Sequence, residues 1–416
     1  MRVLLSTVGT RGDVQPVQAL ALEVRALGHE VRVAVPPNFQ DWFADHGFEA
    51  TPVGIEMRAP KPGAAASPPP TPEQLRQLGA TAADLITDQF DSIGTAAKGC
   101  DLVVGAGTHQ YAARSIAEVN GVPYVNAVYA PVSLPSPDHA PPPAPGQAWQ
   151  TGLPPAEISQ RWEATSRAWN DRSLERINDN RARLGLAPID DVQSHIFTDH
   201  TWLATDPTLG PAPASPGRQV VQTGAWLLPD TSPLAPELET FLAAGDPPVY
   251  LGFGSMPAPE STGRTLIDAA RATGRRAILS RGWADLGLVD DGSDGGADCL
   301  SIGDVNQQAL FPRVAAIVHH GGAGTTTAAA RAGAPQVIAP MFNDQFYWGQ
   351  RVRDLGIGST APSGPLTVEA LAAALHEALA PAVADRARSV AGQVATDGAA
   401  VAARRLTAVR ERRSAS

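Results

Sequence analysis

A segment in the second half of the chain combines glycines, histidines and a hydroxyl side chain in an order suited to anion binding. It reads His319-His320-Gly321-Gly322-Ala323-Gly324-Thr325 and follows the apolar run 314–318. A strand that passes through glycines into a helix leaves backbone N–H groups and the positive helix end free to meet an anion. A diphosphate suits that geometry, with His319 donating a charge-assisted hydrogen bond and Thr325 adding its hydroxyl. The alternative is a tight packing turn with a core histidine.

A carboxylate near the N-terminus is a candidate for acid–base chemistry. Thr10-Arg11-Gly12-Asp13 follows the apolar run 3–6. The turn after a strand lies at the carboxyl edge of a parallel sheet, where open α/β proteins bind ligands. Asp13 can act there as a general base toward a hydroxyl group if the cleft is dry. The alternative is that Asp13 is simply the N-cap of the following helix.

Composition limits the class of protein. The chain has 416 residues, 43% of them hydrophobic and 18% charged, with 39 Gly and 38 Pro. This is globular composition with many loops, and the length predicts two domains of about 200 residues each. The net charge is −10, and the basic residues are scattered until an arginine-rich tail at 404–413. No extended positive face is expected, which argues against nucleic acid as a partner.

Cysteine usage and the N-terminus bear on the compartment. Cys100 and Cys299 are far apart and lack metal-type spacing, which argues against a disulfide framework and a zinc site. The apolar stretch at 1–6 is too short for a signal peptide, and no later run approaches the roughly 20 apolar residues needed to span a bilayer. We expect a cytoplasmic protein without a membrane span, as a monomer or a weak dimer.

The elements that must position these residues alternate between strands and helices. Short apolar runs indicate strands covered on both faces, and apolar spacing of three and four indicates helices. In the first half, strands are expected at 3–6, 30–35, 101–104 and 123–128, and helices at 17–27 and 111–119. In the second half, strands are expected at 248–252, 276–280, 315–319 and 336–339, and helices at 266–273, 325–332 and 382–410. The pattern predicts two doubly wound parallel α/β domains facing each other.

The domain boundaries follow from composition. A stretch rich in Pro, Gly, Ser and Thr precedes the restart of the strand–helix alternation in the second half. We assign residues 1–215 to the first domain, 216–232 to a linker and 233–395 to the second domain. The remaining segment, 396–416, is a helix and tail that is a candidate for packing back on the first domain.

The chain resembles a known family of enzymes. Four segments look like the nucleotide-sugar domain of glycosyltransferase family one. They are the anion-type turn at 319–325, Gly252-Phe253-Gly254-Ser255, Val305-Asn306-Gln307-Gln308-Ala309-Leu310 and Asp344-Gln345. The likeness is greatest to the vancomycin-group glycopeptide glycosyltransferases, through the segments 2–5, 11–13, 222–226, 278–283 and 396–400. It covers nearly the whole chain, and the motifs in the second half are the more specific.

The resemblance implies a GT-B fold of two Rossmann-like domains and metal-independent transfer with inversion at the anomeric carbon. The chain contains no Asp-x-Asp motif, which agrees with the absence of a divalent ion. No cofactor is expected, only a UDP- or dTDP-sugar as co-substrate. The resemblance places the diphosphate near Ser255, His319, Gly322, Ala323, Gly324 and Thr325, the nucleoside near Arg281, Trp283 and Val305, and the sugar near Asp344 and Gln345.

The resemblance also points to Asp13 as the base, with Thr10, His109 and His139 as candidates on the acceptor side. For His109 the alternative is a pocket wall, and for His139 a solvent-exposed position in the proline-dense stretch 135–145. For Asp344 and Gln345 together, the alternative is an exposed loop pair.

One departure from the family concerns the ribose. Plant-type members carry a Glu that binds the ribose hydroxyls, and by spacing its place falls at Thr327. A dTDP-sugar is therefore as plausible as a UDP-sugar. The expected acceptor is the hydroxyl of a natural-product aglycone such as a glycopeptide, selected by the stretches 59–71, 135–145 and 162–169. Two alternatives remain, a nucleotide-sugar 2-epimerase of the same architecture and an inactive partner protein.

Overall fold

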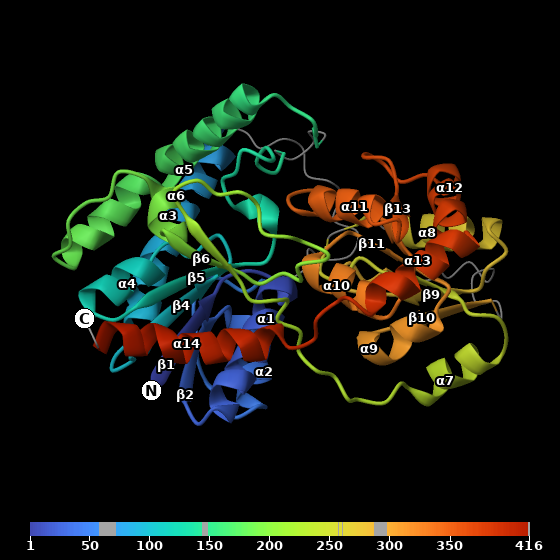
Figure 1. The fold of residues 1–416 in the computed structure, drawn as a ribbon, viewed down its shortest axis with the longest axis horizontal. Helices are drawn as coiled ribbons and strands as arrows, with labels where there is room; N and C mark the ends of the chain where they lie inside the picture. The colour runs from blue at the N-terminus through green and yellow to red at the C-terminus, as the bar shows by residue number, and fades with distance from the viewer. Residues whose placement is uncertain (58–71, 144–148, 257, 260, 287–297, 415–416) are drawn as a thin grey trace.

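The computed structural model describes residues 1–57, 72–143, 149–256, 258–259, 261–286 and 298–414. It contains two α/β lobes that lie side by side, and the last helix returns to the first lobe (Figure 1). No helix in these ranges is long and apolar enough to cross a membrane. The acceptor stretch proposed at 59–71 lies outside the described residues.

The first lobe is built on a parallel sheet in the order β3-β2-β1-β4-β5-β6-β7. Val3 and Leu5 enter the hydrophobic cluster on one face, and Leu4 enters the cluster on the other, as the period of two in a strand requires. The strands are β1 (Arg2–Thr7), β2 (Glu30–Val35), β3 (Glu49–Pro52), β4 (Leu102–Ala106), β5 (Tyr124–Val128), β6 (His200–Leu203) and β7 (Gln219–Gln222). The helices are α1 (Arg11–Ala26), α2 (Gln40–Ala44), α3 (Pro72–Ala96), α4 (Ala113–Val119), α5 (Pro155–Arg183) and α6 (Val192–Phe197).

The second lobe repeats this plan on a parallel sheet in the order β10-β9-β8-β11-β12-β13. Its strands are β8 (Val249–Leu251), β9 (Ala277–Ser280), β10 (Cys299–Ile302), β11 (Ala316–His319), β12 (Gln336–Ile338) and β13 (Gly358–Thr360). Its helices are α7 (Pro236–Ala243), α8 (Thr262–Ala272), α9 (Gln307–Leu310), α10 (Ala323–Arg331), α11 (Gln345–Asp354), α12 (Val368–Ala378) and α13 (Pro381–Ala391), and α14 (Gly398–Ser414) follows. The expected fold class is confirmed.

Two segments differ from their sequence-based description. The segment 216–232 contains β7, which pairs with β6 in the first sheet, so the chain leaves the first lobe only after Gln222. Strand β7 is only half-buried, which is why its apolar signal is weak. The helical stretch expected at 382–410 is broken between α13 and α14. Helix α14 then packs with the first lobe through Ala399, Ala402, Ala403 and Leu406.

The two lobes share a hydrophobic cluster. Ala130, Val132 and Leu209 of the first lobe pack with Trp348 and Val352 of the second. A polar contact reinforces it, since the Arg351 side chain donates to the carbonyl oxygen of Leu209 at 2.8 Å. The lobes therefore meet as one packed interface.

The segment that follows β7 and the segment that leads into α14 cross at Gly224 and Gly398. Gly224 has φ +89°, and a Cβ there would lie 2.9 Å from the Cα of Gly398. A Cβ on Gly398 would lie 2.4 Å from the carbonyl oxygen of Ala225. The crossing therefore requires glycine on both segments, and it fixes where α14 starts toward the first lobe.

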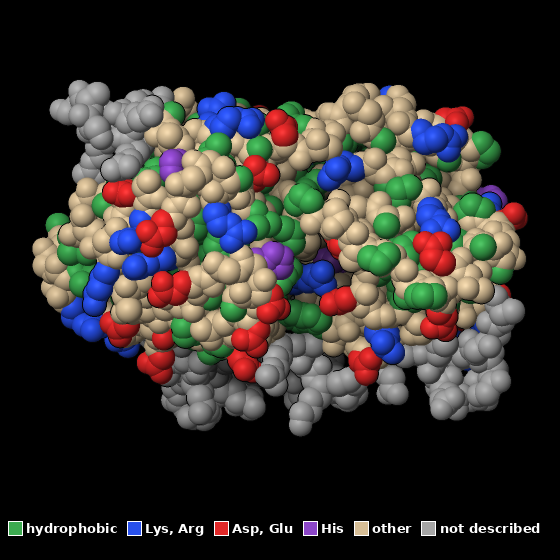
Figure 2. Space-filling view, turned by 90° about the horizontal axis from the view of Figure 1, so that it is seen from below, with side chains coloured by type: hydrophobic (Ala, Val, Ile, Leu, Met, Phe, Trp, Pro, Cys, Tyr) green, Lys and Arg blue, Asp and Glu red, His purple; other side chains and the backbone are tan. Residues whose placement is uncertain are grey.

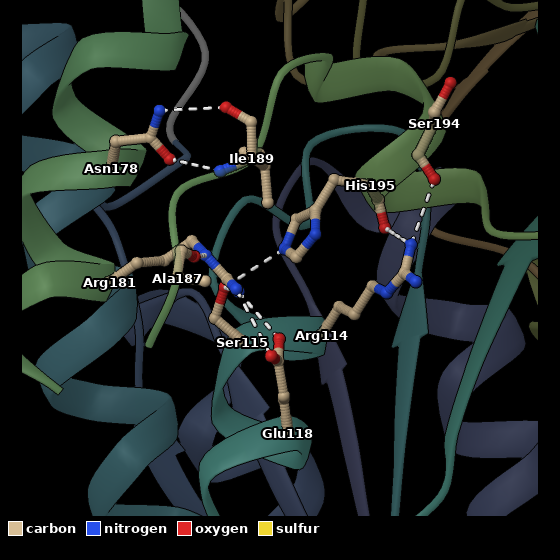
Figure 3. Close-up of polar contacts among 9 residues, drawn as sticks. All are labelled: Arg114, Ser115, Glu118, Asn178, Arg181, Ala187, Ile189, Ser194 and His195. Carbon is tan, nitrogen blue, oxygen red and sulfur yellow. Dashed lines mark hydrogen bonds and ion pairs between the residues drawn. The ribbon is translucent and has the colours of Figure 1, made fainter. Parts of the chain in front are cut away.

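A buried polar network joins α4, α5 and α6 (Figure 3). Arg181 of α5 donates to Ser115 Oγ at 2.9 Å and to Glu118 Oε2 at 2.8 Å. Ser115 Oγ also lies 3.0 Å from His195 Nε2. The serine and the histidine resemble a nucleophile and its base, but Ser115 is completely buried and already accepts from Arg181. The network therefore holds helices together, and no local sequence pattern predicts it because its members are distant in the chain.

Replacing Gly398 by Ala should destabilise the protein. The added Cβ meets backbone atoms that have no side-chain freedom to yield, so we expect a loss of about 1–3 kcal/mol in the free energy of unfolding. Gly392→Ala is the matched control, because its Cβ would meet only one atom, at 3.9 Å. Denaturant unfolding of both variants measures the difference, and equal stabilities would contradict the crossing described above.

Stability should also depend on the charge of His195. Burial lowers the pKa of His195 from 6.5 to about 3. Between these values the unfolded chain binds a proton that the folded protein does not, so stability is lost as the pH falls below about 6.5. From pH 7 to pH 5 one such histidine costs about 2 kcal/mol. His195→Gln should remove that part of the pH dependence in denaturant unfolding, whereas replacement of the exposed His376 should not; an unchanged slope in His195→Gln would contradict the account.

Candidate active site

Each sheet has one point where the strand order reverses, and Asp13 and the glycine turn before α10 lie at these two points. In the first sheet it lies between β1 and β4, and in the second between β8 and β11. Such switch points open a crevice at the carboxyl ends of the strands. Viewed from below, hydrophobic, basic and histidine side chains meet at the middle of the molecule between the lobes (Figure 2).

The anion-type turn joins β11 to α10. Gly321 has φ +94°, and a Cβ there would lie 2.8 Å from Ile338 Cγ2. Gly322 is the N-cap of α10, and its carbonyl oxygen accepts a hydrogen bond from Thr326 N–H at 2.9 Å. The N–H groups of Ala323, Gly324 and Thr325 therefore precede the hydrogen-bond ladder of the helix. Gly324 is exposed, and a Cβ there would meet nothing within 4 Å, so this helix start is open to a ligand.

His319 does not serve this turn in the way expected. Its ring is completely buried. Nδ1 accepts from Gly321 N–H at 3.1 Å, and Nε2 lies 2.9 Å from Gln336 Oε1. Burial lowers the pKa of His319 to about 4, so the ring is neutral near pH 7. The expectation that His319 donates a charge-assisted bond to a phosphate is wrong in this structure, because both ring nitrogens are used to shape the turn.

The histidine beside the turn is His320, which the sequence reasoning passed over. Its Nε2 lies 2.6 Å from the position of a Cβ on Gly322, and its Cε1 lies 3.5 Å from that of a Cβ on Gly254. Nδ1 is buried and has no hydrogen-bond partner among the described residues. Burial lowers its pKa to about 3, with a further contribution from His319. A neutral ring with an unused nitrogen thus lies between the turns after β8 and β11.

The turn after β8 brings Ser255 to the same edge. Trp283 N–H donates to the carbonyl oxygen of Gly254 at 2.8 Å, which joins this turn to the one after β9. Gly282, at φ +55°, makes the approach possible, since a Cβ there would lie 2.4 Å from the same oxygen. Ser255 is half-buried and next to the turn that carries His320. The structure therefore brings the predicted phosphate-side residues together, with the exception of His319.

The three nucleoside candidates lie after β9 and β10. Arg281 is exposed, and Val305 is partly buried against the cluster beneath α9. The Trp283 ring stacks on Phe39 of the first lobe, with ring centroids 6.3 Å apart. Thr327 is buried and donates its hydroxyl to the carbonyl oxygen of Ala323 at 2.8 Å, so it faces the helix rather than a ligand.

The two candidate sugar-binding residues have different surroundings. Asp344 is half-buried, and its Oδ2 accepts from Trp348 Nε1 at 2.9 Å. Gln345 is buried, and its Oε1 accepts from the N–H groups of Met341 at 2.7 Å and Phe342 at 3.2 Å. The side-chain amide oxygen of Gln345 thus shapes the loop before Asp344, and neither residue belongs to an exposed loop pair.

Asp13 lies at the switch point of the first sheet. Thr10 is the N-cap of α1, and Asp13 is at the third helical position, where its Oδ2 accepts from Thr10 N–H at 2.9 Å. A Cβ on Gly9 would lie 2.1 Å from that oxygen, and Oδ1 lies 3.8 Å from the position of a Cβ on Gly107. The carboxylate is therefore held between the ends of β1 and β4, with one oxygen tied to the helix start.

The electrostatics of the two carboxylates are linked. Burial raises the pKa of Asp13, the hydrogen bond from Thr10 N–H partly opposes this, and the charge of Asp344 adds to it, which together place the pKa at about 7. Burial likewise raises the pKa of Asp344 to about 6. A carboxyl with a pKa near 7 is suited to proton transfer near neutral pH. The fold thus brings Asp13 of one lobe into the electrostatic range of Asp344 of the other.

The remaining candidates lie in the first lobe. His109 is accessible to solvent as a residue, while the surrounding protein desolvates its ring and lowers its pKa. The ring stacks on Trp169, with ring centroids 6.3 Å apart. It lines a cavity of about 950 Å³, together with Trp162 and Phe342. His139 is half-buried, not exposed, because its ring packs against Trp162 and that indole donates to its carbonyl oxygen at 2.8 Å. His109 thus lines the cavity, whereas His139 packs against Trp162 and does not itself line it.

Within the ranges that the structure describes, no group of three or more His, Cys, Asp or Glu side chains is arranged to hold a metal ion. Cys100 and Cys299 are both buried, and no disulfide joins them.

Family models match both lobes. Residues 3–135 match the glycosyltransferase family 28 N-terminal domain, and residues 299–405 match the C-terminal domain of erythromycin biosynthesis protein CIII-like proteins. The chain is 49% identical over 409 residues to the vancomycin aglycone glucosyltransferase of Amycolatopsis orientalis, covering 98% of this chain and 97% of that protein. It is 42% identical over 400 residues to the dTDP-epi-vancosaminyltransferase of the same organism, covering 94% and 93%.

Solved structures share the fold at lower identity. Spinosyn forosaminyltransferase SpnP superposes with a TM-score of 0.69 at 19% identity, covering 99% of each chain. Glycosyltransferase VinC, solved in complex with dTDP, gives 0.66 at 22% identity, covering 99% of this chain and 100% of that one. These likenesses, with the two parallel sheets, confirm the expected GT-B architecture.

Proposed function

The chain belongs to the vancomycin-group glycosyltransferases, and we propose that it moves a hexose or deoxyhexose from a UDP- or dTDP-sugar to a hydroxyl of an antibiotic aglycone. The observation that carries the proposal is the pair of switch points, with a carboxyl near neutral pKa on one side and an open helix start on the other. A base and an anion site facing across a cleft suit a displacement at carbon.

In the proposed step, the acceptor oxygen forms a bond to the anomeric carbon while the bond from that carbon to the diphosphate breaks. The acceptor proton passes to the free carboxylate oxygen of Asp13, whose other oxygen is held by Thr10. The diphosphate leaves toward the start of α10. Because the attacking and leaving oxygens lie on opposite sides of the carbon, a single displacement inverts its configuration.

The departing diphosphate is proposed to be held by the N–H groups of Ala323, Gly324 and Thr325, with Gly322 as the N-cap. Preorganised donors of this kind stabilise developing negative charge. His320 is proposed to add its Nε2, which lies beside Gly322 at the helix start. We propose that these groups suffice without a divalent ion, and that Asp344 binds a sugar hydroxyl.

Thr327 bears on whether the donor nucleotide contains ribose or deoxyribose. Its hydroxyl is used within α10, so this position offers nothing to a ribose 2′-hydroxyl. This favours a deoxyribose nucleotide, in line with the dTDP-sugar in the name of one relative. The acceptor proposed is a glycopeptide aglycone, after the aglycone in the name of another relative. A 2-epimerase would instead release product without any acceptor, which the assay below separates.

The base assignment predicts a pH profile. With a pKa near 7, Asp13 is deprotonated and competent above that value, so kcat/KM should rise with pH and level off above about 7. Asp13→Asn keeps an oxygen for Thr10 N–H but cannot accept the proton, so turnover should fall roughly 10²–10⁴-fold. Nucleotide-sugar binding by calorimetry should remain within about twofold of wild type, because the anion site is on the other lobe.

A control comes from the neighbouring glycines. Gly9→Ala places a Cβ against Asp13 Oδ2, whereas at Gly12 the nearest atom to a new Cβ is Thr10 Oγ1 at 3.8 Å. We expect turnover to be lost in Gly9→Ala and largely retained in Gly12→Ala. Normal turnover by Asp13→Asn would refute the base assignment, and product formed without an aglycone would refute transfer.

The nucleotide-sugar side is tested by His320→Ala. Loss of a hydrogen bond to a charged oxygen should weaken nucleotide diphosphate binding about 10–100-fold in calorimetry. The exposed His376→Ala is the matched control on the same lobe. Wild-type turnover should be the same with and without EDTA. Unchanged binding in His320→Ala would remove this ring from the site, and loss of turnover in EDTA would overturn the metal-independent step.

A further inference from the structure

The cavity of about 950 Å³ beside the cleft is lined mainly by the first lobe and closed by the second. Trp162 and Trp169 of α5 and Trp149 before it supply indole surface, and the His109 ring continues the wall. Phe342 and Asn343 form the opposite side, directly before Asp344. The cavity therefore ends beside the proposed sugar position, where an acceptor must lie.

The charge of this cavity is opposite to that of the protein. The chain carries a net charge of −10, yet the cavity is lined by Arg161 and Arg172 and by no Asp or Glu among the described residues. Arg161 is engaged, since its Nη2 donates to Glu157 Oε1 at 2.6 Å and also to Gln150. Arg172 makes no hydrogen bond or ion pair with any residue that the structure describes.

Arg172 is an exposed side chain on the cavity wall. Burial lowers the pKa of His109, and the charge of Arg172 lowers it further. Burial raises the pKa of Tyr111, and the charge of Arg172 offsets part of that rise. The His109 ring lies nearly parallel to Trp169, at an angle of 14°. The uncompensated guanidinium thus stands next to an aromatic surface on the same wall.

We infer that this cavity takes an aromatic acceptor that carries a carboxylate, and that Arg172 is the residue that selects for the carboxylate while the tryptophans bind the rings. The inference rests on the proposed function and names the chemistry of its acceptor. A planar guanidinium matches a carboxylate in a two-bond fork, and such charge-assisted pairs are the stronger hydrogen bonds. Aromatic rings gain further contact from stacking on indoles.

Binding of a matched pair of probes tests the inference without turnover. The probes are 6-hydroxy-2-naphthoate and its methyl ester, which differ by the charge, titrated in calorimetry at low salt. Wild type should bind the acid at least about tenfold more tightly than the ester. Arg172→Gln should bind both equally, and Arg172→Lys should keep part of the preference because it keeps the charge.

Arg176→Gln is the matched control, since Arg176 is exposed on the same helix four residues later and does not line the cavity. It should retain the wild-type preference. Equal binding of acid and ester by wild type, or a preference that persists in Arg172→Gln, overturns the inference. These binding measurements do not depend on sugar transfer. Failure of the proposed function would be seen separately, as the absence of product that requires an acceptor.

Discussion

Trp348 connects the interface between the lobes to the chemistry of the cleft. Its indole is almost completely buried, and its Cη2 lies 2.8 Å from the position of a Cβ on Gly210 of the first lobe. The same side chain donates Nε1–H to Asp344 Oδ2 at 2.9 Å. The contact that packs the lobes therefore also orients a carboxylate between them. Asp13 lies within the electrostatic range of Asp344 because the lobes meet in this way.

The cleft is shaped by backbone approaches that only glycine permits. Gly9 leaves space for the carboxylate of Asp13, and Gly282 lets the turn after β9 reach the carbonyl oxygen of Gly254. Gly321 lets the turn after β11 pass beneath α11. In each case a Cβ would meet an atom closer than 3 Å, so these glycines determine where the polar groups of the site can lie.

Desolvation sets the charge states of the ionisable groups in the site. It raises the pKa of Asp13 and Asp344 and lowers that of His319 and His320, so each group is held closer to its neutral form. A cleft with little fixed charge suits a reaction in which a proton moves to one side and a diphosphate departs to the other. The cavity next to it is different, because Arg172 keeps an uncompensated positive charge there.

The sequence by itself determined the alternation of strands and helices, the glycine turn before α10 and the position of Asp13 after the first strand. These depend on local backbone preferences and on periodicity, which neighbouring residues encode. It could not decide between His319 and His320, because β11 directs one ring toward Gln336 in the neighbouring strand and leaves the other at the turn. The pairing of β7, the role of Trp348, the place of Arg172 in the cavity wall and the link between Asp13 and Asp344 were decided by the tertiary structure, since each depends on contacts between segments far apart in the chain.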